Sequence, residues 1–96
     1  MSRPADFKFQ LYVAGDTRNS TLAIANLTAF CRAHLADHHE IEVIDVFREP
    51  KRALVNSVFL TPTLVKLTPG PVRKIVGTLS QETTMLQTLG LTFAAA

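Results

Sequence analysis

The sequence is poor in cysteine and glycine and contains no tryptophan and no long apolar run. Its 96 residues include one cysteine, so no disulfide can form within the chain, which excludes a disulfide-stapled secreted domain. The four glycines (Gly15, Gly70, Gly77 and Gly90) are too scattered to form a phosphate-binding loop. Uncharged stretches end well short of the roughly 18 apolar positions of a membrane span, and residues 1–6 carry no signal pattern. We therefore expect a cytoplasmic protein without a membrane partner.

The composition is that of a folded globular chain with mild charge. Hydrophobic residues make up 47% and charged residues 19%, which excludes a disordered or fibrous chain, and the length suits one domain over 1–96 with a core at about 7–91. The net charge of +2 comes without a basic stripe interleaved with aromatics, which argues against nucleic acid. Residues 37–45 are acidic and residues 48–74 are basic. This polarity favours a protein partner, with an ordinary solvated surface as the alternative.

The first half of the sequence predicts a strand, a helix and a second strand. Residues 7–14 alternate between apolar and other side chains, as in a strand, and 41–47 form a second such segment. Between them, an apolar face recurs at helical spacing from about 20 to 36, with Asn19 or Ser20 as the predicted N-cap. A strand–helix–strand unit of this length predicts two parallel strands with a right-handed crossover.

The second half predicts a short helix, a hairpin and a last helix. The helix spans 51–58 after Pro50, the strands span 64–67 and 72–76, and the final helix runs from 81 to 89. Ser80 is its predicted cap and Gly90 its predicted end. The resulting order, βαβαββα, is that of the thioredoxin fold, an α/β class. Pro62, in Thr61-Pro62-Thr63 directly before a strand, falls where that fold places its cis-proline.

The sequence lacks the cysteine that a thioredoxin-type enzyme carries at the start of its first helix. A redox thiol is needed at the start of the first helix, but residues 15–20 hold no cysteine. Cys31 lies in the middle of the apolar helical face, where a buried structural cysteine is the simplest interpretation. No Ser/His/Asp order or paired-carboxylate site stands out either, so we expect no enzyme and no cofactor.

The three histidines suggest a metal site only weakly. His34 and His38 are four residues apart and His39 is adjacent, with Asp37 and Glu40 nearby as further candidate ligands. The helix is expected to end there, however, and no cysteine completes a ligand set. Solvated histidines favoured by the helix dipole are the preferred interpretation, so no metal is expected.

Several segments, in order and covering roughly residues 8–90, resemble the KaiB family of bacterial circadian-clock proteins. They are residues 11–15 (LYVAG), 19–20 (NS), 43–46 (VIDV), 49–50 (EP), 61–64 (TPTL), 71–77 (PVRKIVG) and 79–80 (LS). The resemblance implies a non-catalytic clock or signalling protein that binds the N-terminal ring of the KaiC ATPase. It also implies a metamorphic alternative, in which the free protein packs its C-terminal half differently as a tetramer or dimer.

The basic segment supplies the candidate residues for binding such an ATPase. Five cations would meet an acidic surface on the partner, and Tyr12 would support the packing; the cations are Lys51, Arg52, Lys66, Arg73 and Lys74. The alternative is that Arg73 and Lys74 are solvated strand residues or hold a homo-oligomer together.

The sequence also departs from the family pattern. Arg18 stands where cyanobacterial members usually carry proline, residues 51–57 replace a usual acidic run, and Thr78 replaces a usual aspartate. The second strand carries Glu40 and Glu42, which puts an interaction with the KaiA partner in doubt. A KaiB-like protein outside the three-protein oscillator fits these departures. A degenerate thioredoxin-fold redox protein using Cys31 and an adaptor in a histidine-kinase pathway are the alternatives.

Overall fold

The computed structural model describes residues 6–91 and has the predicted thioredoxin-like element order. The elements are β1 (Phe7–Val13), α1 (Arg18–His34), β2 (His39–Asp45), α2 (Pro50–Val55), β3 (Thr63–Thr68), β4 (Arg73–Val76) and α3 (Glu82–Thr88). In the described part of the chain, no helix is long and apolar enough to cross a membrane.

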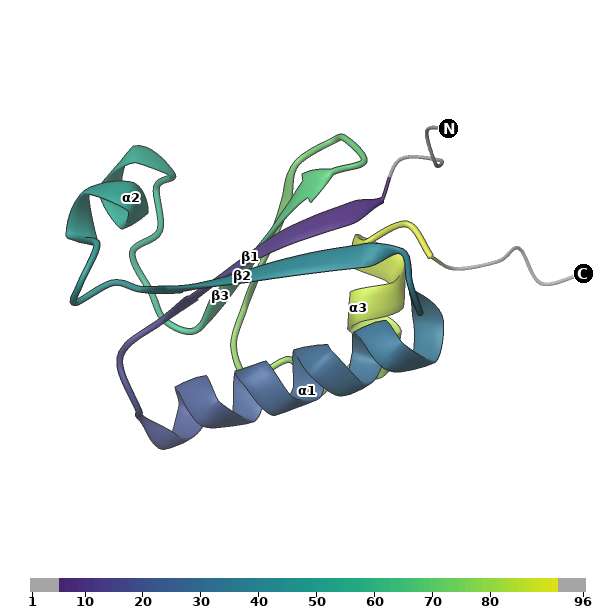
Figure 1. The fold of residues 1–96 in the computed structure, drawn as a ribbon, viewed down its shortest axis with the longest axis horizontal. Coiled ribbons are helices and arrows are strands. Elements are labelled where there is room, and N and C mark those ends of the chain that lie inside the picture. The colour runs from purple at the N-terminus through teal and green to yellow at the C-terminus, as the bar shows by residue number, and fades with distance from the viewer. Residues whose placement is uncertain (1–5, 92–96) are drawn as a thin grey trace, which may run out of the picture.

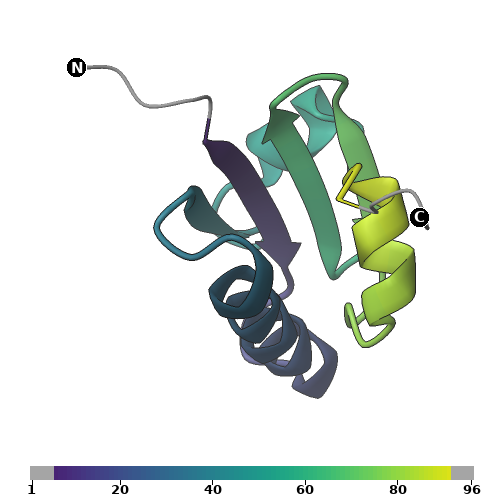
Figure 2. The same ribbon diagram turned by 90° about the vertical axis from the view of Figure 1, so that its right-hand side faces the viewer.

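The strands form one mixed sheet in the order β2-β1-β3-β4 (Figure 1). β1 and β2 are parallel, as the crossover through α1 requires, and β3 is antiparallel to both β1 and β4. Leu11 in the central strand lies opposite Val43 on one side and Leu64 on the other. Helices α1 and α3 cover one face of this sheet and α2 lies against the other (Figure 2).

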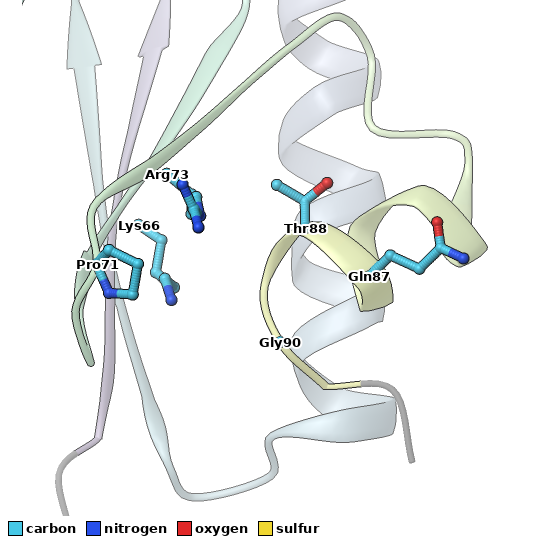
Figure 3. Close-up of a pocket in the computed structure, with 6 residues that line it drawn as sticks. All are labelled: Lys66, Pro71, Arg73, Gln87, Thr88 and Gly90. Atoms are coloured by element: carbon cyan, nitrogen blue, oxygen red, sulfur yellow. The ribbon is translucent and has the colours of Figure 1, made fainter. Parts of the chain in front are cut away.

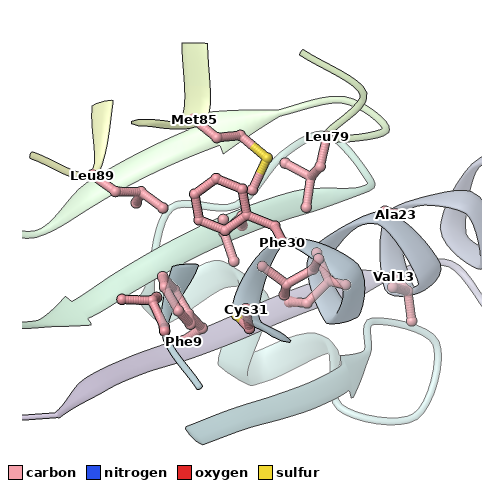
Figure 4. Close-up of a cluster of buried hydrophobic side chains, with 12 residues drawn as sticks. Phe9, Val13, Ala23, Phe30, Cys31, Leu79, Met85 and Leu89 are labelled. Atoms are coloured by element: carbon pink, nitrogen blue, oxygen red, sulfur yellow. The ribbon is translucent and has the colours of Figure 1, made fainter. Parts of the chain in front are cut away.

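Each covered face has its own apolar core, because alternate side chains of a strand point to opposite faces. The larger cluster lies under α1 and α3 (Figure 4) and comprises Phe9, Leu11, Val13, Ala23, Leu27, Phe30, Cys31, Leu35, Leu64, Leu79, Met85 and Leu89. The smaller cluster, under α2, comprises Tyr12, Ile44, Ala53, Val58 and Val65. The α2 layer is therefore held by far less buried apolar surface than the α1 layer.

Two predicted helix caps are wrong. Thr17, not Asn19 or Ser20, caps α1, and its side chain accepts a hydrogen bond from the Ser20 amide at 3.4 Å. Ser20 is instead buried, and its hydroxyl oxygen accepts from the Ala14 amide at 3.0 Å, which ties the helix to the end of β1. The N-cap of α3 is Gln81 rather than Ser80, and no side chain bonds to the free amides there.

The end of α3 agrees with its prediction. Gly90 has a φ of +73°, in the left-handed region that favours glycine. Its amide donates to the Gln87 carbonyl at 3.2 Å, and the Leu91 amide donates to the Leu86 carbonyl at 2.8 Å. This pair of bonds is a Schellman motif, which satisfies the last carbonyls of the helix.

Candidate functional site

The basic residues predicted to bind a partner do not form one surface. Lys66 and Arg73 lie opposite each other in the β3–β4 ladder, and Lys74 lies opposite Val65. Because side chains alternate along a strand, Lys66 and Arg73 are on the face packed by α3, whereas Lys74 is on the face packed by α2. Lys66 and Arg73 line a hollow beside α3 (Figure 3).

Arg52 joins α2 to the edge strand β2. Its Nη1 and Nη2 donate to the two carboxylate oxygens of Glu42 at 2.7 and 2.9 Å, a bidentate pair, and Nη1 also lies 3.4 Å from Glu49 Oε1. The hydrogen bonds from Arg52 lower the pKa of the Glu42 carboxyl and raise the pKa of the guanidinium. Much of the Arg52 charge is therefore compensated within the protein.

Tyr12 and Lys74, both on the sheet, form hydrogen bonds to the end of α2. Tyr12 has no exposed surface; its hydroxyl donates to Gln10 Oε1 at 2.8 Å and accepts from Asn56 Nδ2 at 2.7 Å. Burial raises the pKa of this hydroxyl, so it stays a neutral donor and acceptor. The Lys74 ammonium donates to the Asn56 and Ser57 carbonyls, just past the C-terminus of α2. In this packing Tyr12 has no surface that a partner could contact, and its hydroxyl is bonded to the end of α2.

The α2 face carries an apolar surface that the sequence analysis missed. Five large side chains are mostly exposed there: Leu54 (67%), Val55 (82%), Phe59 (78%), Leu60 (63%) and Val76 (57%). We call these residues the apolar patch. A hollow of about 130 Å³ beside it is lined by Phe59, Leu60, Lys74 and Val76, among others. A signal was available, because six of the eight residues at 53–60 are apolar, more than a helix of two turns can bury against one strand layer.

The peptide bond between Thr61 and Pro62 is cis, at the position that the element order of the sequence identified. The Pro62 carbonyl accepts a hydrogen bond from the Gly77 amide at 2.9 Å. The segment before β3 is thereby joined to the end of β4.

The start of α1 holds no thiol. Its N-cap is Thr17, whose hydroxyl lies 2.8 Å from the hydroxyl of the buried Ser20. Cys31 is fully buried in the larger core cluster, and burial raises the pKa of its thiol to about 11. A thiol that is neutral at physiological pH and closed to solvent is a poor nucleophile, which argues against the redox alternative.

Each of the three histidines lies close to a carboxylate or a backbone carbonyl. His34 Nε2 lies 3.0 Å from Glu82 Oε2, His38 Nδ1 lies 3.5 Å from Asp6 Oδ1, and His39 Nδ1 lies 2.9 Å from the Leu35 carbonyl. Within residues 6–91, no group of three or more His, Cys, Asp or Glu side chains could hold a metal ion.

Comparison with known proteins decides the family. The KaiB domain family matches residues 10–91. This chain belongs to the KaiB family. It is 39% identical over 82 residues to a circadian clock protein KaiB3 from Synechocystis sp., covering 85% of this chain and 78% of that protein. It is 38% identical to a circadian clock oscillator protein KaiB from Prochlorococcus marinus, covering 97% of this chain and 80% of that one.

Solved structures confirm the fold. The N-terminal domain of SasA from Synechococcus elongatus matches with a TM-score of 0.77 at 20% identity, covering all of this chain and 94% of that domain. Mitochondrial thioredoxin 3 from Saccharomyces cerevisiae matches with a TM-score of 0.69 at 22% identity, covering 85% and 74%. At these identities the likeness is one of fold, and this KaiB-family chain shares the packing of thioredoxins without their helix-start cysteine.

Proposed function

We propose that this KaiB-family protein is a non-catalytic clock or signalling protein that binds a KaiC-type ATPase through its α2 face. The observation that carries the proposal is the apolar patch next to the cations of α2 and β4. Phe59, Leu60 and Val76 line one hollow together with Lys74, and exposed apolar side chains beside a cation are typical of protein-binding surfaces. Family membership supports the KaiC-type ATPase as the partner, since relatives bear the name circadian clock oscillator protein KaiB.

The charges at the rim of the patch favour an acidic partner surface. Lys51 is exposed on α2 and Lys74 is exposed beside the hollow at Phe59. Arg52 is compensated by Glu42 and therefore contributes mainly by holding α2 in place. Rim charges of this kind set the rate of encounter and the orientation of docking, while the buried apolar side chains supply most of the affinity.

The proposal includes the metamorphic change of fold that the family resemblance implies. Support comes from the weak local stability of the second half of the chain. Helix α2 has six residues and α3 has seven, and neither N-cap side chain bonds to the free amides of its helix. Short helices without such caps depend on tertiary packing, and the core under α2 is small. Two packings that differ by a few kcal/mol can then exchange when a partner binds one of them.

A KaiA-type partner at the β2 edge does not form part of this proposal. β2 is an edge strand, and Glu40 and Glu42 are both exposed on it. Glu42 is engaged by Arg52, and the exposed Glu40 leaves an acidic edge. The protein then works outside the three-protein oscillator.

The mass of the purified protein in solution, with and without a KaiC-type ATPase from the same source, tests the proposal. We expect a free oligomer, a tetramer or a dimer, that becomes a monomer bound in a complex the size of the ATPase ring. A protein that keeps its mass and stays out of the ring fraction would overturn the proposal. Labelling of Phe59→Cys with a fluorophore reports binding independently, since docking removes that position from water.

A further inference from the structure

A second hollow lies on the opposite side of the sheet from the apolar patch. It has a volume of about 400 Å³ and is lined by Lys66, Pro71, Arg73, Gln87, Thr88 and Gly90 (Figure 3). The two cations lie on the sheet side. Thr88 lies on the α3 side with its methyl group turned towards them and its hydroxyl turned away, and the Gln87 side chain also extends away. No carboxylate is among the residues that line it.

Lys66 is a buried residue that lines this hollow. It is only 4% exposed, and its ammonium makes no hydrogen bond or ion pair with any residue from 6 to 91. The Phe7 ring centroid lies 6.0 Å from Nζ, at the outer limit of a cation–π interaction. Within residues 6–91 the ammonium thus has no negative partner, and an anion entering the hollow would supply one.

A second positive charge, that of Arg73, lies beside Lys66. Arg73 lies directly opposite it in the β3–β4 ladder, so two positive charges meet on one face of a hairpin. Burial, and then the Arg73 charge, lower the pKa of the Lys66 ammonium. The hollow is thus an open electropositive cavity, in which an anion would relieve the repulsion between the two cations.

We propose that the hollow between β3–β4 and α3 is a binding site for a phosphate group, held by Lys66 and Arg73. A phosphate carries nearly two negative charges at neutral pH, which matches the two cations, whereas a carboxylate carries one. The planar guanidinium binds phosphate through paired N–H donors, and the ammonium adds a point charge. This site is independent of the proposed ATPase surface, since it lies on the other face of the sheet.

Titration of the full-length protein at constant ionic strength tests the site. The probes are inorganic phosphate and O-phosphoserine, with acetate as the singly charged control and amide and side-chain NMR shifts as the readout. We expect saturable shifts around Lys66, Arg73 and Thr88 with phosphate and little response to acetate. Binding of both probes assigns the site to phosphate esters as well as the free ion; binding of inorganic phosphate alone assigns it to the free ion.

Neighbouring residues on one strand provide matched variants. Arg73→Gln should weaken phosphate binding about tenfold or more, a loss of about 1.4 kcal/mol, because Arg73 lines the hollow. Lys74→Gln removes the same charge on the opposite face and should leave binding unchanged. Lys66→Met should abolish binding, and the exposed Arg73 variant keeps the test valid if that core variant fails to fold. Equal weakening by Arg73→Gln and Lys74→Gln, or no saturable shift with either probe, would overturn the proposal.

Discussion

The side-chain amide of Asn56 donates a hydrogen bond to the hydroxyl of Tyr12 at 2.7 Å, joining the end of α2 to the central strand of the sheet. The same amide also donates to the Arg52 carbonyl at 3.0 Å. Because the apolar core under α2 is small, these polar contacts determine where α2 and its apolar patch lie.

Replacing Tyr12 by Phe should lower the free energy of unfolding by about 1–2 kcal/mol, because Asn56 and Gln10 lose a partly buried hydrogen-bond partner. Urea denaturation measures the change. A double-mutant cycle with Asn56→Ala should show coupling between the two residues. Additive effects would contradict a role for this bond in positioning α2.

Glu42→Gln should remove an acid-sensitive part of the stability. Arg52 lowers the pKa of Glu42 in the folded state, so the pair stabilises the fold above the unfolded pKa of about 4.3, and this contribution is lost as the pH falls through the folded pKa. Denaturation midpoints of wild type and variant should therefore converge at low pH. Because both side chains are exposed, the difference at neutral pH should shrink with added salt. A difference independent of pH would contradict the ion pair.

Cys31 should be inert in the folded protein. Its thiol is buried and has a pKa of about 11, so iodoacetamide at pH 8 should label it at least about tenfold more slowly than in urea. A group whose pKa rises on folding stabilises the fold fully below its unfolded pKa of about 8.5 and loses that effect as the pH rises towards 11. Cys31→Ala should consequently reduce the loss of stability above pH 9. Rapid labelling of the native protein would revive the redox alternative.

The first half of the fold was predictable because its signals are local. Alternation in β1 and the apolar face of α1 each follow from a single element. The cap at Thr17 was missed, since the Ser20 hydroxyl bonds to Ala14 instead of to its own helix, and α1 and β2 each begin and end two residues earlier than predicted. Because side chains alternate along a strand, the sequence of β1 also predicted that Tyr12 faces away from Phe9 and Leu11. It did not predict that α2 would cover Tyr12.

The division of the basic residues between two faces could not be predicted in the same way. It depends on the register of β3 and β4, and that register depends on the turn from 69 to 72, which contains two prolines. Arg73 and Lys74 are adjacent in sequence, yet one lines the hollow beside α3 and the other supports α2. Basic residues that are close in sequence were therefore predicted to share one surface, although alternate side chains of a strand point to opposite faces of the sheet.

Binding of a KaiC-type ATPase by three single variants tests the central claim most directly. Phe59→Ser and Lys51→Glu alter the α2 face, and Arg73→Glu makes the same charge reversal on the other face. We expect that Phe59→Ser weakens binding about tenfold or more, that Lys51→Glu slows association, and that Arg73→Glu binds like wild type. Loss of binding in Arg73→Glu, with Phe59→Ser and Lys51→Glu unaffected, would contradict the central claim.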